Sequence, residues 1–388
     1  MKNKLYPELR FKAENGKDYP EWKNEKLDKI FNSIRGNGLS KDDIALNGQY
    51  ECVLYGELYT TYDRQIKTVI SKTNKKTKNC LLSKKNDVLM PNSTTTVALD
   101  LINFTWLNKN DIILGGDITA LRLKNEGDGL FFSYCLTEKK ELQVFGQGST
   151  IIHLNFNNIR NFELLVPSFL EQQKIANFFS SLDTQIDDVT KLLERTKELK
   201  KGYLQKIFNQ ELKFKDEKGK AYPEWEKKKL KDITKNIISN LTAVNSNNTG
   251  KFPIYDANEI VAYNEIAVVK EPYVTIIKDG AGAGRLRILP KNTSFTGTMT
   301  AFVGKEINTE FLYYLLLTKD FNKYKVGTTI PHIYYRDYKN EEMFVPIEQE
   351  QLKISIFFTS LDKKIEYFGQ LLQKLQEKKK GYMQKMFI

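Results

Sequence analysis

The chain of 388 residues lacks the common motifs that indicate a catalytic activity. It has no GxxxxGK[ST] phosphate loop, no HExxH zinc motif and no Asn/Asp-Pro-Pro-aromatic motif, which holds a flipped base in amino-methyltransferases. Its two histidines and three cysteines show no metal-site spacing. These absences argue against an ATPase, a zinc enzyme and a methyltransferase of that type.

Long apolar runs and paired cysteines are also missing. No segment approaches the roughly 20 apolar residues of a membrane span, and the start MKNKLYPELRF contains no apolar signal region. Cys52, Cys80 and Cys135 are an odd number without a CxxC pair, so we expect reduced, buried thiols. We therefore expect a cytoplasmic protein with no membrane partner.

Acidic residues are too few to balance the basic ones. The 60 Lys and Arg exceed the 48 Asp and Glu by 12, and segments 168–208 and 347–388 contribute only +4 of that excess. A chain with a pI near 9.2 suggests a polyanionic partner, most commonly nucleic acid. The alternative is a merely basic surface encoded by a Lys- and Asn-rich genome.

The sequence does contain an internal repeat, at two offsets. One set recurs 203 residues later: Leu9, Phe11, Gly16, Tyr19, Pro20, Glu21 and Trp22 return as Leu212, Phe214, Gly219, Tyr222, Pro223, Glu224 and Trp225. Another, from Pro167 to Tyr203, recurs 179 residues later, from Pro346 to Tyr382. Two halves of like build therefore share framing segments and enclose inserts that differ in length by 24 residues.

Segments 168–208 and 347–388 each predict a long helix. Seam positions alternate by four and three residues, as in a coiled coil. In the first helix they are Ile175, Phe179, Leu182, Ile186, Val189, Leu193, Thr196, Lys200, Tyr203 and Ile207, and each recurs 179 residues later. We expect the two helices to bury these seams on each other, rather than to pack separately as ordinary amphipathic helices.

Charged and capping residues of these helices suggest further detail. Ser168 and Glu171 predict a capping box at the start of the first helix. Lys200 and Lys379 fall on the seam, where we expect their stems to lie along the packed surface with their charged heads in solvent.

The inserts, residues 20–166 and 223–345, mix strand-like and helical runs. Segments 50–55 and 273–277 predict strands, whereas 131–136 and 311–317 predict short helices, so the class is α+β. In the repeat, position 1 corresponds to 204 and position 388 to 209. We therefore predict that the N-terminal segment lies beside the end of the second long helix.

Three insert segments are candidate DNA contacts, although any single residue in them could belong to a solvated loop. The basic run 71–79, the hydroxyl-rich turn 91–96 and the glycine-rich loop 279–285 supply Lys72, Lys75, Lys76, Lys78, Ser93, Thr94, Lys278, Arg285 and Arg287. Glycine permits close approach to a ligand, and arginine can bind guanine or phosphate through two bonds. The glycine loop misses the spacing of nucleotide-binding motifs, so we do not favour that alternative.

The two histidines share one repeat position. Gly148 to His153 matches Gly327 to His332 at an offset of 179. A contact to nucleic acid or a partner subunit is one interpretation. We favour the other, a structural histidine satisfied at a turn.

Doubled framing blocks, doubled coiled-coil helices and two divergent basic inserts resemble the specificity subunit of type I restriction–modification systems. The resemblance rests on Tyr-Pro-Glu-Trp at 19–22 and 222–225, on the Val-Pro…Gln helix openings at 166–173 and 345–351, and on Gly-Tyr at 202–203 and 381–382. Nearly the whole chain is covered.

The resemblance implies two target-recognition domains separated by two long antiparallel coiled-coil helices, in a pseudo-two-fold internal repeat. The expected divisions are an N-terminal framing segment (1–19), recognition domain 1 (20–166), helix 1 (167–211), a framing segment with recognition domain 2 (212–345), and helix 2 (346–388). Each domain would read one half of a bipartite, asymmetric site in double-stranded DNA.

The resemblance also implies partners that carry out the chemistry. The helices would set the spacer and dock two modification (methyltransferase) subunits, and restriction subunits that translocate and cut DNA would complete the complex. AdoMet, ATP and Mg²⁺ would be used by those partners, and this chain would catalyse nothing.

Two other classes stay open. One is a self-contained nuclease or methyltransferase, which would act on DNA alone when given Mg²⁺ or AdoMet. The other is a coiled-coil assembly or stalk protein without DNA specificity, which would show no salt-dependent DNA affinity.

Overall fold

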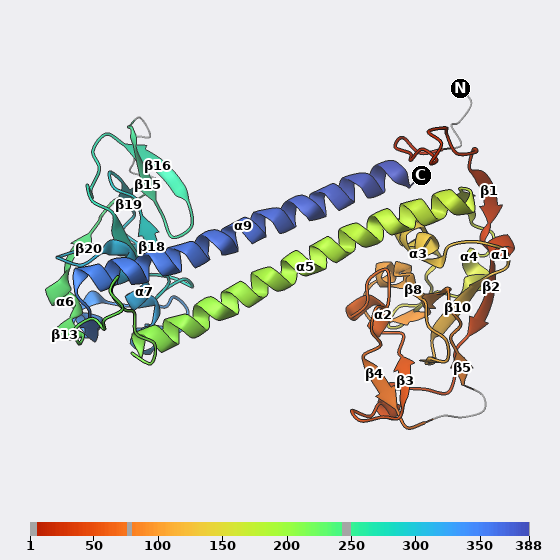
Figure 1. Ribbon diagram of the computed structural model, residues 1–388, viewed down its shortest axis with the longest axis horizontal. Coiled ribbons are helices and arrows are strands. Elements are labelled where there is room, and N and C mark those ends of the chain that lie inside the picture. Colours follow the sequence, from red (N-terminus) through yellow and green to blue (C-terminus); the bar gives the residue numbers. More distant parts are fainter. Residues whose placement is uncertain (1–5, 76–79, 243–249, 388) are drawn as a thin grey trace. The chain divides into compact units, whose positions relative to one another are not determined.

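The computed structural model describes residues 6–75, 80–242 and 250–387. The chain divides into two compact units (Figure 1). Unit 1 comprises residues 1–188 and 372–388, and unit 2 comprises residues 189–371. Each unit therefore contains one insert with its framing strands and a part of each long helix.

Unit 1 is built on a four-stranded antiparallel sheet in the order β2-β10-β6-β8. Its strands are β2 (Phe31–Arg35), β10 (Ile118–Leu123), β6 (Asp87–Pro91) and β8 (Thr105–Leu107). All of β6 is buried, and α3 (Gly129–Glu138), with nine buried residues, packs against β6 and β8. This sheet and helix form the core that supports the loops of unit 1.

Smaller elements surround this core. A second sheet contains β4 (Ser71–Thr73), β3 (Tyr50–Val53), β9 (Ile113–Leu114) and β5 (Leu81–Leu82), in that order. Two short pairs join β1 (Lys23–Lys26) to β12 (Glu163–Val166) and β7 (Ser93–Thr94) to β11 (Ile152–His153). The short helices are α1 (Leu27–Ile30), α2 (Glu57–Thr60), α4 (Phe156–Ile159), η1 (Lys41–Asp43), η2 (Ala98–Ile102) and η3 (Lys140–Phe145).

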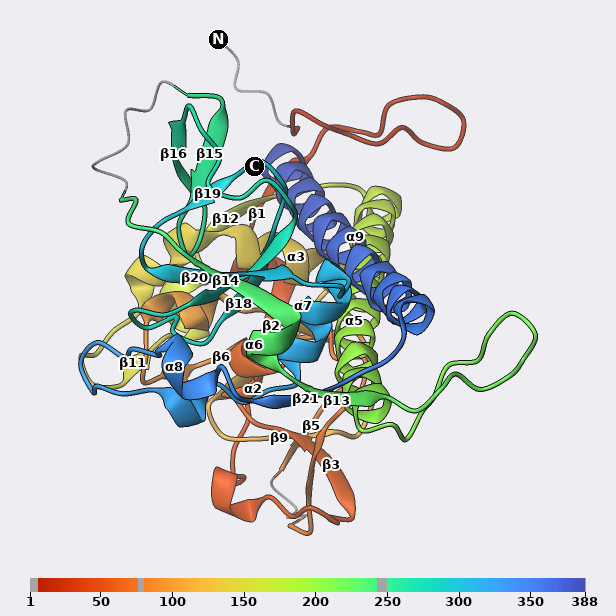
Figure 2. The ribbon, with the colours of Figure 1, turned by 90° about the vertical axis from the view of Figure 1, so that its left-hand side faces the viewer.

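Unit 2 repeats the core sheet in the order β14-β20-β17-β18. These strands are β14 (Thr234–Ile238), β20 (Met299–Gly304), β17 (Tyr273–Ile277) and β18 (Leu286–Leu289), and α7 (Thr309–Leu317) packs on them. Figure 2 faces this unit, with β15 and β16 at the top. The other elements are β15 (Phe252–Tyr255), β16 (Ile260–Asn264), β19 (Ser294–Phe295), β13 (Glu226–Lys229) paired with β21 (Glu342–Val345), α6 (Leu230–Ile233), α8 (Tyr335–Tyr338) and η4 (Asn322–Tyr324).

The two inserts are therefore variants of one α+β fold, which confirms the predicted class and the internal repeat. The offset between corresponding strands is 203 at β2 and β14 but 186 at β6 and β17. Thus 17 of the 24 extra residues of the first insert lie between its first and second core strands, in segment 36–86. The rest of the core keeps nearly constant spacing.

The long helices are α5 (Phe169–Phe208) and α9 (Glu348–Met386), shown in Figure 1. Within each unit their segments run antiparallel, because higher residue numbers on α5 meet lower ones on α9: Phe178 packs on Tyr382, and Tyr203 packs on Phe357. None of the ten predicted seam positions of either helix is exposed. The predicted coiled-coil seam is confirmed.

The start of the described chain lies against the end of α9, as predicted. In unit 1 the Leu9 N–H donates to the Lys385 carbonyl (3.0 Å). At the corresponding place in unit 2, the Leu212 N–H donates to the Lys206 carbonyl, also at 3.0 Å. A contact that is local within the continuous chain of unit 2 is therefore made in unit 1 by segments from the two ends of the sequence.

The predicted capping box at Ser168 and Glu171 is wrong. The buried Glu171 carboxylate instead accepts bonds from Arg10 (2.8 Å) and from the indole of Trp22 (3.2 Å), and the Ser168 hydroxyl has no partner among the described residues. The Trp225 indole donates to Glu350 in the same way (3.0 Å). The carboxylate was predicted to close a local turn, but it fastens the framing segment to the helix.

The cysteines are free thiols, two of them buried. Burial raises the pKa of Cys52 to about 11 and that of Cys135 to about 12, so both stay protonated at neutral pH. Along the described residues, no helix is both long enough and apolar enough to span a bilayer.

Candidate nucleic-acid interface

In each unit the connection between the second and third core strands forms a candidate interface. It comprises residues 92–104 after β6 in unit 1 and residues 278–285 after β17 in unit 2. Both are anchored alike, because the Leu154 N–H donates to the Asn92 carbonyl and the Ile333 N–H donates to the Lys278 carbonyl, each at 2.9 Å. Two segments without evident sequence similarity thus occupy one structural position, and we call them the variable loops.

The structure corrects the expectation that Ser93 and Thr94 contact DNA directly. Their exposed fractions are 3% and 0%. The Ser93 hydroxyl bonds to Nδ1 of His153 and the Thr94 hydroxyl bonds to Thr96, each at 2.8 Å. These hydroxyls shape the first variable loop, and residues 95–97 form its exposed tip.

Lys278, Arg285 and Arg287 come together on the β17–β18 hairpin. Arg285 is exposed and donates to the Asn258 side chain (2.7 Å), while the Arg287 guanidinium lies 5.0 Å from the ring centre of Tyr255. Lys278 pairs with its neighbour Asp279 (3.3 Å). The two arginines therefore hold turn 255–258 against the hairpin while keeping further N–H donors.

The glycines of the second variable loop close a tight turn. Gly280 and Gly284 have φ of +89° and +92°, which few other residues adopt readily. The Gly284 N–H donates to the Ile277 carbonyl (2.8 Å), and the loop leads into a strand. It therefore lacks the helix N-terminus on which a nucleotide phosphate loop depends.

The basic run of the first insert belongs to a different sheet from the first variable loop. Lys72 is exposed on β4, and Lys75 pairs with Asp43 (3.0 Å). Lys76 and Lys78 lie outside the described residues. Of the four lysines, Lys72 is the one that the structure places in solvent without an assigned ion pair.

His153 and His332 take equivalent places, each satisfied at a turn as we favoured. His153 exchanges two backbone bonds with Gln147, and His332 exchanges two with Val326. The His332 ring then bonds Asp279 (2.8 Å), as the His153 ring bonds Ser93. In both units, the histidine joins the variable loop to the segment that precedes the histidine in sequence.

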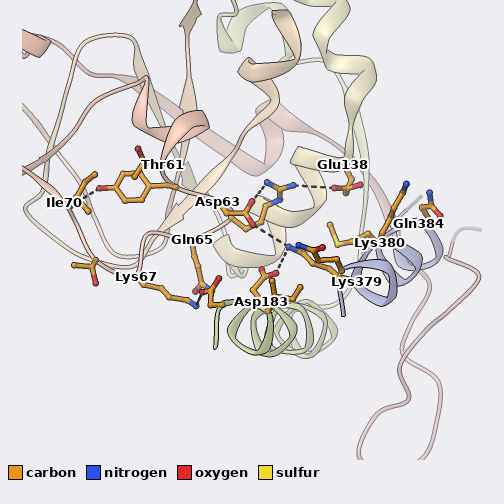
Figure 3. Close-up of a pocket in the computed structure, with 17 residues that line it drawn as sticks. Thr61, Asp63, Gln65, Lys67, Ile70, Glu138, Asp183, Lys379, Lys380 and Gln384 are labelled. Carbon is orange, nitrogen blue, oxygen red and sulfur yellow. Dashed lines mark hydrogen bonds and ion pairs between the residues drawn. The ribbon is translucent and has the colours of Figure 1, made fainter. Parts of the chain in front are cut away.

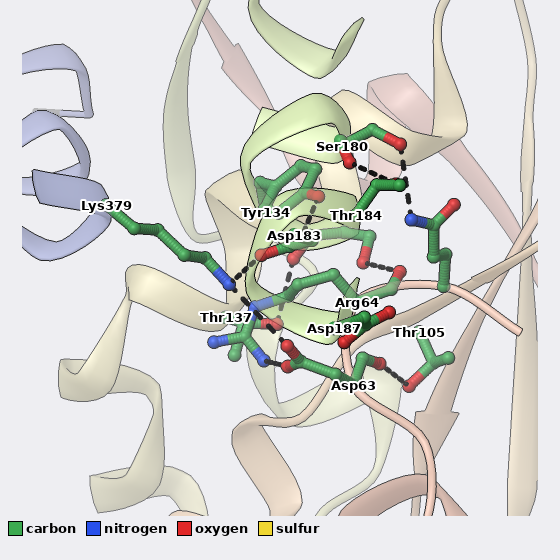
Figure 4. Close-up of polar contacts among 12 residues, drawn as sticks. Asp63, Arg64, Thr105, Tyr134, Thr137, Ser180, Asp183, Thr184, Asp187 and Lys379 are labelled. Atoms are coloured by element: carbon green, nitrogen blue, oxygen red, sulfur yellow. Dashed lines mark hydrogen bonds and ion pairs between the residues drawn. The ribbon is translucent and has the colours of Figure 1, made fainter. Parts of the chain in front are cut away.

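A polar cluster missed by the sequence analysis joins α9, α5 and the core of unit 1 (Figure 4). Lys379 on α9 pairs with Asp183 on α5 (2.5 Å), and Asp183 also accepts a bond from the Tyr134 hydroxyl of α3 (2.5 Å). Burial raises the pKa of Tyr134, so its hydroxyl remains a donor. We call this arrangement the Lys–Asp–Tyr cluster.

Unit 2 contains the same cluster with the helices exchanged. Lys200 on α5 pairs with Asp362 on α9, and the Tyr314 hydroxyl of α7 donates to Asp362 (2.7 Å). The expectation of solvated seam lysines is therefore wrong, since the side chains of Lys200 and Lys379 are only 16% and 18% exposed. The recurrence of the two aspartates at offset 179 was a signal available in the sequence.

Unit 1 has a cleft beside its cluster, of about 680 Å³ (Figure 3). Segment 61–70, which belongs to the longer part of the first insert, forms one wall, and α5 and α9 form the other. Gln65 donates to Ser180 (3.2 Å) and Lys67 pairs with Asp187 (2.8 Å). The extra residues thus brace the first insert against α5.

The fold and these loops define a repeat protein that presents two variable loops on two like α+β frames, each joined to paired helices. A sequence model of the type I restriction modification DNA specificity domain matches residues 19–201 and 222–377. The chain belongs to this family.

Individual relatives agree with this assignment. The type I restriction enzyme MjaVIII specificity subunit of Methanocaldococcus jannaschii is 24% identical over 416 aligned positions, which cover 98% of this chain and 95% of the relative. The crystal structure of a type I S subunit from M. genitalium matches with a TM-score of 0.66 at 19% identity, covering 99% of both chains. A chain from a structural study of type I complex assembly matches with a TM-score of 0.51 at 14% identity, covering 95% of this chain and 98% of its own. The structural likenesses show a shared fold.

Proposed function

We propose that this chain is the DNA-recognition subunit of a type I restriction–modification complex, with each insert reading one half of a bipartite, asymmetric site. The observation that carries the proposal is the pair of variable loops, which occupy one structural position on two like frames but differ in sequence. Sequence-specific readout requires unlike side chains for unlike bases, while a common frame keeps their presentation constant.

Partners would supply the chemistry. Two modification subunits would use AdoMet to methylate adenines, and restriction subunits would use ATP and Mg²⁺. Family membership supports this division of labour, as does the absence from the sequence of the base-holding and phosphate-loop motifs. The helices α5 and α9 would set the spacer between half-sites and dock the modification subunits.

Methylome sequencing tests the proposal. A host with the complete system should carry methylated adenine in one bipartite motif, and deletion of this gene should remove that motif alone. Exchanging residues 92–104 for the corresponding loop of a related chain should change one half of the motif and leave the other. An unchanged methylome after deletion would overturn the proposal and favour the stalk protein.

The basic run of the first insert offers a quantitative test. We expect Lys72, Lys75, Lys76 and Lys78→Ala to weaken DNA binding by the assembled complex, and the slope of log K against log salt to fall by about 1 for each phosphate that is no longer neutralised by a lysine. Fluorescence anisotropy between 50 and 200 mM salt would measure it, with roughly these limits chosen because counterion release is large there. Lys17→Ala, in an exposed turn, is the matched control. An unchanged slope would mean that these lysines touch no phosphate.

A further inference from the structure

One exposed loop is repeated in both units although the inserts around it diverge. Gly148-Ser149-Thr150-Ile151 recurs as Gly327-Thr328-Thr329-Ile330. All eight residues are exposed. We call these the repeated loops.

The repeated loops are rigidly placed beside the variable loops. Backbone bonds between Gln147 and His153 (2.7 and 2.9 Å) and between Val326 and His332 (2.8 and 2.9 Å) close them at their bases. In unit 2, the Gly280 N–H of the variable loop also donates to the Pro331 carbonyl (2.9 Å). Each repeated loop is therefore presented next to the segment proposed to read bases.

Folding explains the glycines but not the residues at the tips. Gly148 and Gly327 have φ of +118° and +89°, and a Cβ atom there would lie 2.0 and 2.8 Å from the carbonyl oxygens of Ile151 and Ile330. The four hydroxyl residues of the tips make no hydrogen bond to another described residue. Exposed side chains that support nothing inside the fold are not needed for the fold.

A repeated exposed surface implies a ligand that is the same at both units. The bases differ between two unlike half-sites, whereas the sugar–phosphate backbone does not. We propose that the repeated loops bind the DNA backbone, one at each half-site, through the hydroxyls of Ser149, Thr150, Thr328 and Thr329. This inference rests on the proposed function.

The chemistry of the loops fits this ligand. Hydroxyl and backbone N–H groups donate bonds to phosphate oxygens, and segments 143–155 and 325–336 contain no acidic residue that would repel them. The side chains of Ile151 and Ile330, 47% and 57% exposed, can pack on deoxyribose.

A modification subunit would also be the same at both units, but the surroundings argue against it. Val144 and Phe145 expose apolar surface near the loop of unit 1. Lys323 and Tyr324 stand at the corresponding positions of unit 2, so no apolar docking surface is shared. The shared exposed feature in these segments is the loop itself.

The test uses the chain assembled with its modification subunits. One variant carries Ser149→Ala and Thr150→Ala, a second carries Thr328→Ala and Thr329→Ala, and a third carries all four. Ser181→Ala with Ser360→Ala, an equivalent pair of exposed serines on α5 and α9, is the control. Affinities for the cognate site and for a scrambled site are measured at several salt concentrations, together with phosphate-ethylation interference.

Each loop variant should bind cognate and scrambled DNA about 3- to 10-fold more weakly, by the same factor. The salt slope should stay unchanged, because a neutral hydroxyl releases no counterion. Ethylation should lose its effect at a few phosphates of one half-site in each single-loop variant.

Three results would overturn the inference while leaving the proposed function intact: affinities equal to the control, a loss confined to the cognate sequence, or a lower content of modification subunits in the complex. A parent complex that binds cognate and scrambled DNA alike would instead overturn the proposed function, before any variant is compared.

Discussion

Lengthening α5 and α9 by one heptad each should abolish recognition of the original spacer and create a preference for a longer one. Seven residues add about 10.5 Å to a helix, which corresponds to about three base pairs at 3.4 Å each. A heptad preserves the seam, so apolar positions such as Val189 and Phe368 keep their packing phase. Insertion after Thr190 and after Leu371 places both additions in the same stretch of the antiparallel pair.

Loss of simultaneous engagement of both half-sites should weaken binding to the original spacer by about 10²- to 10⁴-fold. Competition binding against a series of sites with spacers of every length over one DNA turn would measure the new preference. Seven residues inserted in the exposed turn at Asn15 and Gly16 are the control and should leave the preference unchanged. If the heptad variant kept its original spacer, the helices would not determine the spacing.

Reversing one charge of the Lys–Asp–Tyr cluster should strongly destabilise unit 1. Asp183→Lys sets a second ammonium group against Lys379 and removes the acceptor of Tyr134, where the parent side chains of Lys379 and Asp183 are only 18% and 13% exposed. Removing the partner of a largely buried charge costs about 3–5 kcal/mol in unfolding free energy. Urea unfolding followed by circular dichroism would measure the loss.

Asp187→Lys is the matched control, one turn further along α5. It breaks an ion pair with Lys67 whose side chains are 46% and 50% exposed, and such pairs contribute about 1 kcal/mol or less. Combining Asp183→Lys with Lys379→Asp should recover part of the loss, because opposite charges again face each other while Tyr134 keeps its new neighbour. Equal effects of Asp183→Lys and Asp187→Lys would show that the cluster is not a major source of stability.

The antiparallel arrangement also follows from these charges. Asp183 and Lys200 are 17 residues apart on α5, and Asp362 and Lys379 are 17 apart on α9. Antiparallel pairing places each lysine against an aspartate, whereas parallel pairing would oppose like charges. The clusters therefore favour the observed direction, as polar seam residues do in other coiled coils.

The sequence by itself determined the repeat, the long helices with their seams, the strands at 50–53 and 273–277, and the junction between the N-terminal segment and α9. These features depend on periodicity and local spacing, which are written along the chain. The tertiary structure alone decided which polar side chains meet. It buried Ser93 and Thr94, drew Glu171 to Trp22 across 149 residues and placed Lys200 against Asp362 across 162. Such contacts depend on which strands and helices become neighbours, and local sequence pattern contains no record of that.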